Sequence, residues 1–170
     1  MRKPVDASRL ERFLSALGRR AVGPATVYLV GGSSAVAAGW RSTTRDIGLY
    51  VEDEDLMRLL PALKEELATS VELASPLDFV PELPEWRERS RFLRTEGHLT
   101  VRDFDFYSQA LTKLERGFDQ DLDDVRAMVE RGLVVPARLH ELFDQVSEQL
   151  YRFPAIDAAH LLQAVAGLKP

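Results

Sequence analysis

A glycine- and serine-rich turn follows a short apolar segment near the start of the sequence. Ala25–Val30 is rich in β-branched and aromatic residues, which predicts a buried strand, and the residues Gly-Gly-Ser-Ser at 31–34 follow it directly. Residues 33–38 are small and predict a helix that can lie close to a sheet. Such a strand–turn–helix unit directs backbone N–H groups at one point, and glycine lets a phosphate approach the backbone. The spacing matches neither a P-loop nor the GxGxxG pattern, and glycines also serve tight turns for conformational reasons alone.

An aspartate, Asp46, opens the next predicted strand, residues 46–52. If this strand neighbours the one that ends at the glycines, the Asp46 carboxylate lies near the turn, with Arg41 close by. Mg²⁺ takes one or two carboxylates together with phosphate oxygens, so these groups could hold a metal–triphosphate. The alternative is that Asp46 only bonds to its own loop at the start of the strand.

The remaining pattern predicts an α+β fold, with a mixed β-sheet flanked by helices and a C-terminal helical bundle. We expect the first helix to begin at Ser8, which has capping-box spacing to Glu11, and a leucine-rich helix to follow Asp53 and to kink or restart at Pro61. Further strands are expected at residues 71–74, 77–80, 90–95 and 98–103. From Tyr107 onward the apolar stripes are helical. We therefore expect a core over residues 1–105, with its N-terminal helix, and a helical region over residues 106–170 packed on it as one compact unit.

Composition excludes several function classes. The net charge of −5 and the pI near 5.3 argue against a surface built wholly for nucleic acid. Cysteine is absent, which excludes disulfides, thiolate metal sites and a cysteine nucleophile. No window of 18 uninterrupted apolar residues occurs, so we expect no membrane association and a cytoplasmic location.

Three segments resemble a known enzyme superfamily. They read YLVGGSSAVAAGWRSTTRDI, SPLDFVPELPEW and ALTKLERGFDQDLDDV, and they lie in one order between residues 27 and 135. This chain resembles the DNA-polymerase-beta-like nucleotidyltransferases, and within them the small bacterial enzymes of toxin–antitoxin and abortive-infection systems. The resemblance implies Mg²⁺-dependent transfer of a nucleoside monophosphate from an NTP to a hydroxyl of RNA (tRNA) or protein. It also implies the role of a toxin with a cognate antitoxin as partner.

The resemblance also implies a set of site residues. Asp46 would be the first metal-binding carboxylate, and Asp78, on a later strand, would be the third carboxylate, a metal ligand and the base near the attacking hydroxyl. Lys113 would neutralise phosphate charge and count among the catalytic residues. The residues implied to bind nucleotide are Gly31, Gly32, Ser33, Arg41, Thr44, Lys113 and Asp121, the last by orienting the lysine or its loop.

The sequence departs from the family pattern at Gly48, which stands where the second carboxylate of Asp-x-Asp belongs. Positions 46 and 48 of a strand point to one side, so the glycine removes one metal ligand. Water or Asp78 could fill the place, or activity could be weak. In the alternative function, the protein is a catalytically impaired nucleotidyltransferase fold that binds nucleotide or a protein partner. We expect Gly48→Asp to raise activity, provided that no close neighbour requires glycine there.

Several residues have a simpler interpretation. Lys113 fits an ordinary exposed lysine on an amphipathic helix, and Asp121 fits a favourable charge in the first turn of a helix. Asp105 is expected to cap a helix, and the role of Asp103 is left open between capping and metal binding. The arginines and aromatics of Trp86–Arg94 fit either an RNA-contacting edge or a solvated segment.

Overall fold

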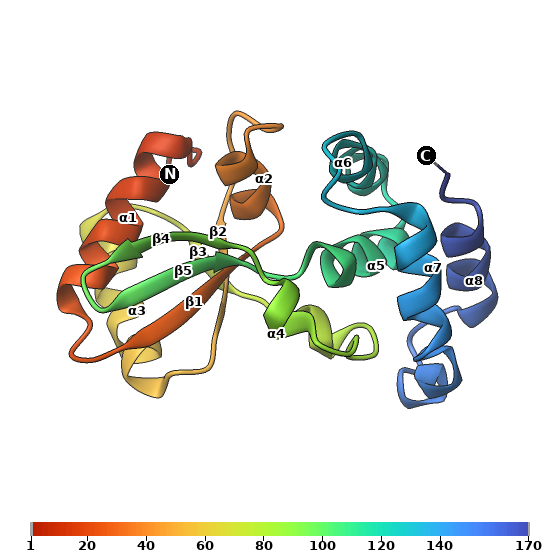
Figure 1. The fold of residues 1–170 in the computed structure, drawn as a ribbon. Coiled ribbons are helices and arrows are strands. Elements are labelled where there is room, and N and C mark those ends of the chain that lie inside the picture. The colour runs from red at the N-terminus through yellow and green to blue at the C-terminus, as the bar shows by residue number, and fades with distance from the viewer. Residues whose placement is uncertain (1, 170) are drawn as a thin grey trace. The chain divides into compact units, whose positions relative to one another are not determined.

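The protein, described by a computed structural model for residues 2–169, divides into two compact units (Figure 1). The first unit contains the chain up to Ser75 together with Ser90–Phe104. The second contains Pro76–Arg89 and the chain from Asp105 onward. The segment Pro76–Arg89 is thus an excursion from the first unit into the second.

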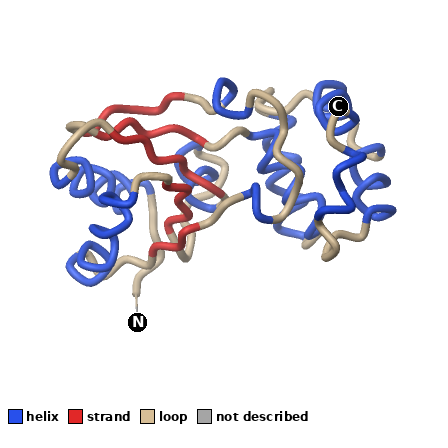
Figure 2. Tube along the Cα trace, turned by 90° about the horizontal axis from the view of Figure 1, so that it is seen from below, coloured by secondary structure: helices blue, strands red, loops and turns tan. Residues whose placement is uncertain are grey.

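The first unit carries all the strands of the described chain and three helices, as Figure 2 shows by colour. Its elements in chain order are α1 (Ala7–Arg20), β1 (Ala25–Val30), α2 (Gly32–Ala38), β2 (Ile47–Val51), α3 (Glu54–Glu66), β3 (Val71–Leu73), β4 (Phe92–Glu96) and β5 (Leu99–Asp103).

The five strands form one mixed sheet in the order β3-β2-β1-β5-β4. The β1–β2 and β4–β5 pairs are antiparallel, whereas β1–β5 and β2–β3 are parallel. This arrangement confirms the expected α+β fold with a mixed sheet flanked by helices. It also places the end of β1, where the glycines lie, beside the start of β2.

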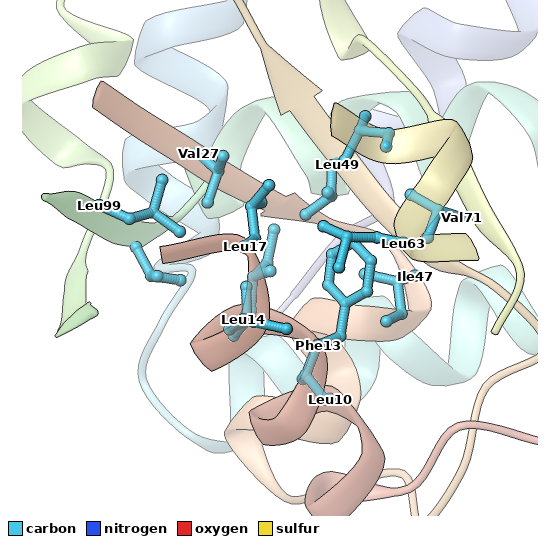
Figure 3. Close-up of a cluster of buried hydrophobic side chains, with 14 of the residues drawn as sticks. Leu10, Phe13, Leu14, Leu17, Val27, Ile47, Leu49, Leu63, Val71 and Leu99 are labelled. Atoms are coloured by element: carbon cyan, nitrogen blue, oxygen red, sulfur yellow. The ribbon is translucent and has the colours of Figure 1, made fainter. Parts of the chain in front are cut away.

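The core of this unit lies between α1, α3 and one face of the sheet (Figure 3). The apolar stripe of α1 follows helical spacing, so all its members face the sheet. The buried residues labelled in Figure 3 are Leu10, Phe13, Leu14, Leu17, Val27, Ile47, Leu49, Leu63, Val71 and Leu99. The strand residues that alternate with these therefore point to the opposite face.

Aromatic rings occupy that opposite face. Tyr28 of β1 lies between two core residues of its strand, and its ring packs against those of Tyr50 and Phe104 with centroid distances of 5.8 and 5.9 Å. Tyr50 and Phe104 meet edge to face at 5.3 Å. The face that carries Gly48, two residues before Tyr50, is therefore the aromatic face of the sheet.

Three local expectations need correction. The cap of α1 is Asp6, which accepts a hydrogen bond from the Arg9 amide at 2.8 Å, so the helix begins before Ser8. Helix α3 continues through Pro61 as one element, capped by Asp53 as expected. The strand expected at residues 77–80 is wrong, because Pro76–Asp78 forms a short 3₁₀ helix (η1).

The second unit is helical over its described residues. It contains η1, α4 (Trp86–Arg89), α5 (Phe106–Arg116), α6 (Asp119–Glu130), α7 (Pro136–Asp144), η2 (Ser147–Arg152) and α8 (Ala158–Ala166). Within residues 2–169, every helix is too short or too polar to span a bilayer.

Candidate functional site

The turn after β1 needs both of its glycines. Gly31 has φ +65° and ψ −126°, a conformation that a side chain rarely allows. Gly32 lies against the loop before β2, and a Cβ placed on it would fall 2.7 Å from the Thr44 Cβ and 3.2 Å from an Arg41 Nη1. The structure therefore brings together four of the residues implied to bind nucleotide, namely Gly31, Gly32, Arg41 and Thr44.

The two serines of the turn point inward. Ser33 and Ser34 are both fully buried. The Ser33 hydroxyl donates to the carbonyl oxygens of Gly48, at 2.7 Å, and Val30, at 3.1 Å, and so ties the turn to β2 and β1. Its hydroxyl is thus committed to the backbone, so any contact of Ser33 with phosphate in this conformation is left to its main chain.

Asp46 lies directly before the start of β2, the strand that neighbours the one ending at the glycine turn. Thr44 donates its hydroxyl to the Asp46 carbonyl oxygen at 3.1 Å, and this links the residue to the loop that Gly32 contacts. The Asp46 carboxylate accepts a hydrogen bond from the hydroxyl of Ser70. It also lines an open depression of about 410 Å³ with Ser70 and the arginines Arg2 and Arg45. The Asp46 side chain therefore does more than bond to its own loop, because it contacts Ser70 and lines the depression beside two arginines.

Gly48, the position of the missing carboxylate, has no space for a side chain. It pairs with Val30 across β1 and β2. A Cβ added to Gly48 would overlap the carbonyl oxygen of Val30 and lie 3.3 Å from its carbonyl carbon, and both atoms belong to the backbone. The glycine is thus required by a close neighbour, which removes the condition under which Gly48→Asp was expected to raise activity.

The register of β2 and β3 reveals an acidic residue that sequence reasoning missed. Gly48 of β2 is the register partner of Glu72 of β3, and register partners of neighbouring strands point to the same face. Glu72 is exposed, and Ser70, two residues earlier, binds Asp46 on that same face. The sequence shows only that a glutamate lies inside a short apolar segment, and this does not reveal that Glu72 pairs with Gly48.

The donor set on this face fits Mg²⁺ in chemical type. Asp46 and Glu72 offer carboxylate oxygens, which a hard cation prefers, and Mg²⁺ held on a polyphosphate needs only one or two of them. Among residues 2–169, no group of three or more His, Asp or Glu side chains is placed to hold a metal ion. Phosphate oxygens and water would have to complete the coordination.

Asp78, the implied third carboxylate, lies in η1 of the second unit and not on a strand of the sheet. It is exposed. Its assignment as metal ligand and base stays a prediction.

Lys113 and Asp121 are brought together, but not as an exposed pair. The Lys113 ammonium on α5 lies 2.8 Å from an oxygen of Asp124 and 3.7 Å from one of Asp121, both on α6. All three side chains are at least 93% buried. Arg116 closes the cluster with a bidentate bond to Asp121, at 2.5 and 3.2 Å. The interpretation of Lys113 as an exposed lysine is therefore wrong, whereas its contact with phosphate stays a prediction.

The arginines of residues 86–94 are engaged in the protein itself. Arg87 stacks on Trp86 at 4.4 Å, and Arg89 forms a bidentate bond with Asp105 at 2.8 and 3.0 Å. Arg94 pairs with Glu11 and Glu96. These contacts favour a structural role for the segment over an RNA-contacting edge.

Asp103 and Asp105, adjacent to the end of β5, have separate roles. Asp105 caps α5 by accepting from the amides of Tyr107 and Ser108, which confirms the capping expectation. Asp103 is fully buried and accepts from Ser34 at 2.6 Å and from Arg91 at 3.0 Å. Burial raises the pKa of the Asp103 carboxyl, while its bonds to Ser34 and Arg91 oppose that rise.

Comparison with known proteins places the chain in a family. Residues 9–163 match the profile of a family described as "nucleotidyltransferase of unknown function (DUF6036)". Searches of curated proteins and of solved structures gave no significant match. Because the match covers most of the sequence, the chain belongs to this family of nucleotidyltransferases.

Proposed function

We propose that the protein transfers a nucleoside monophosphate from an NTP to a hydroxyl group of an RNA, such as a tRNA end, or of a protein. The observation that carries this proposal is the contact between the glycine turn and the loop that precedes Asp46. Gly32 packs on Thr44, and Thr44 bonds to the Asp46 backbone, so the glycine turn after β1 and a carboxylate just before β2 lie at adjoining ends of two neighbouring strands. Family membership makes this pair the first place to expect an NTP.

The chemistry requires little beyond positioning and charge neutralisation. The acceptor oxygen forms a bond to the α-phosphorus, the bond from that phosphorus to the bridging oxygen breaks, and pyrophosphate leaves. The hydroxyl proton passes to a carboxylate or to water. In the proposal Asp46 and Glu72 would hold Mg²⁺, which would supply charge neutralisation on the phosphates. The turn holds the triphosphate, and Arg2 and Arg45 add positive charge beside Asp46.

The test supplies each NTP labelled at the α-phosphate, Mg²⁺, and either total RNA or total protein. The parent should transfer label to one acceptor class, and Asp46→Asn should lower the rate at least about a hundredfold, since metal-borne neutralisation is worth several kcal/mol. Glu72→Gln should raise the Mg²⁺ concentration needed for half-maximal NTP binding. Asp55→Asn, an exposed acid on α3, is the matched control and should change neither quantity. Label transfer that Asp46→Asn leaves unchanged would overturn the site.

The toxin role is a further part of the proposal and rests on the sequence resemblance alone. Induced expression of the parent should arrest bacterial growth, whereas Asp46→Asn should not. Co-expression of a cognate antitoxin would relieve the arrest. Equal growth with both forms would remove the toxin role without affecting the transfer reaction.

One observation favours a second candidate function, a catalytically impaired fold that binds nucleotide or a protein partner. The Val30 carbonyl fills the place of the second Asp-x-Asp side chain, so one expected metal ligand cannot exist at Gly48. NTP binding without label transfer to any acceptor would select this function.

A further inference from the structure

Beside the glycine turn, hydrogen bonds link the buried residues Ser34 and Asp103 to the partly exposed Arg91. Asp103, the last residue of β5, receives the Ser34 hydroxyl on one oxygen at 2.6 Å. Its other oxygen accepts from Arg91 Nη2 at 3.0 Å and Nε at 3.2 Å. The backbones are joined as well, because the Asp103 amide donates to the Arg91 carbonyl at 2.8 Å. Asp103 is therefore held from both its main chain and its side chain.

Ser34 connects these hydrogen bonds to the turn. It is fully buried in the first turn of α2, two residues after Gly32. Its neighbour Ser33 is bonded to β1 and β2, so the two serines together tie the turn to three strands of the sheet. A glycine turn has little conformational preference of its own, so outside contacts must fix its geometry. The bond to a carboxylate is the strongest kind available for this purpose.

Stability alone does not explain a carboxylate at this place. The Asp103 side chain is fully buried while Arg91 is 44% exposed, so the carboxylate loses its hydration and gains attraction only from a cation that water still reaches. What the Asp103 carboxylate supplies, and an apolar residue cannot, is a directed acceptor for the Ser34 hydroxyl. This acceptor therefore fixes the orientation of the Ser34 hydroxyl.

We propose that Asp103 is a positioning residue: oriented by Arg91, it fixes Ser34 and thereby sets the backbone of residues 31–33 to receive the nucleotide phosphates. That the turn receives nucleotide phosphates rests on the proposed function. That Asp103 and Ser34 fix the turn rests on the hydrogen bonds described above. Asp103 touches neither substrate nor metal in this account.

The experiment measures NTP binding and backbone hydrogen exchange on the full chain, well below each variant's unfolding temperature. Ser34→Ala and Asp103→Ala should each weaken Mg–NTP binding about tenfold, consistent with loss of one charged hydrogen bond, and should not add in the double variant. Amide exchange in residues 31–35 should accelerate. Asp103→Asn keeps an oxygen for Ser34 and should retain more affinity than Asp103→Ala.

The control is Asp53→Ala, which removes the cap of α3 and so weakens the same unit away from the turn. It should leave both NTP affinity and exchange at the turn unchanged. Loss of stability in the Asp103 variants with normal affinity and normal exchange would overturn the inference. If the parent binds no NTP, the proposed function fails instead, and faster exchange in the Asp103 variants would then show positioning of a turn with another ligand.

Discussion

Replacement of Lys113 by alanine should strongly destabilise the protein. The change leaves two carboxylates, Asp121 and Asp124, buried between α5 and α6 with one cation fewer. Removing one partner of a buried pair costs about 3–5 kcal/mol, and the low end applies because Arg116 still pairs with Asp121. A loss of about 3 kcal/mol corresponds to a fall of roughly 6–12 °C in Tm for a chain of this length. Urea denaturation and thermal unfolding, followed by circular dichroism at pH 7, measure both quantities.

The matched control is Arg126→Ala on α6, whose pair with Asp123 is also 2.8 Å long but mostly exposed on both sides. Exposed pairs contribute roughly 0–1 kcal/mol, so this variant should unfold close to the parent. The double variant Lys113→Met/Asp124→Leu should recover much of the loss, because it removes both charges of the shorter pair. If Lys113→Ala unfolds together with Arg126→Ala, the cluster does not hold the helices and the argument from burial fails.

Two further predictions concern the first unit. Gly48→Ala should cost about 1–3 kcal/mol in the free energy of unfolding, because its Cβ forces the Val30 carbonyl to move, whereas Gly23→Ala, at a site with open space, should be nearly neutral in urea denaturation. Gly48→Asp should likewise destabilise and fail to raise label transfer; a stable, faster variant would contradict the close approach. For Asp103, burial raises the folded-state pKa above the ordinary 3.8, so the parent should lose stability relative to Asp103→Asn as pH rises from about 4 through that raised pKa. The unfolding free energies of both proteins, measured between pH 4 and pH 7, test this. A difference between them that is constant, or that changes in the opposite sense, would show that the pKa of Asp103 is ordinary or lowered.

Local patterns predicted most elements of the first unit because their signals are contained within a few residues. Asp53 caps α3 as its spacing to the leucines suggests, and β1 is the apolar run before the glycines. The strand prediction for residues 77–80 was wrong because an apolar run forms a strand only where a neighbouring strand is available. Pro76 begins a 3₁₀ helix there, and the segment belongs to the helical unit.

The site was harder to predict because its decisive contacts join residues that are distant in sequence. Lys113 has the surroundings of a surface lysine until α6 brings Asp124 against it. Glu72 becomes relevant only through its register with Gly48, which depends on how β3 pairs with β2. Neither relation leaves a local pattern in a single sequence.

The missing carboxylate and the tight turn are two results of the same local packing. Ser33 donates to the carbonyl oxygens of both Val30 and Gly48, and these bonds link the paired ends of β1 and β2 at the position where a Gly48 side chain would have to emerge. A carboxylate at position 48 therefore requires a change in the backbone as well as in the side chain, because the strand ends must separate and the Ser33 bonds must break or rearrange. An acidic residue on the neighbouring strand β3, at Glu72, avoids that conflict, since β3 pairs with the edge of β2 that faces away from β1 and the turn. If the chain retains metal-dependent transfer, we expect the second carboxylate to come from β3, and combined Ser33→Ala/Gly48→Asp variants to be tolerated better than Gly48→Asp alone. Urea denaturation of the three proteins measures this difference, and equal stability of the single and double variants would show that the Val30 carbonyl, and not the Ser33 bonds, sets the limit.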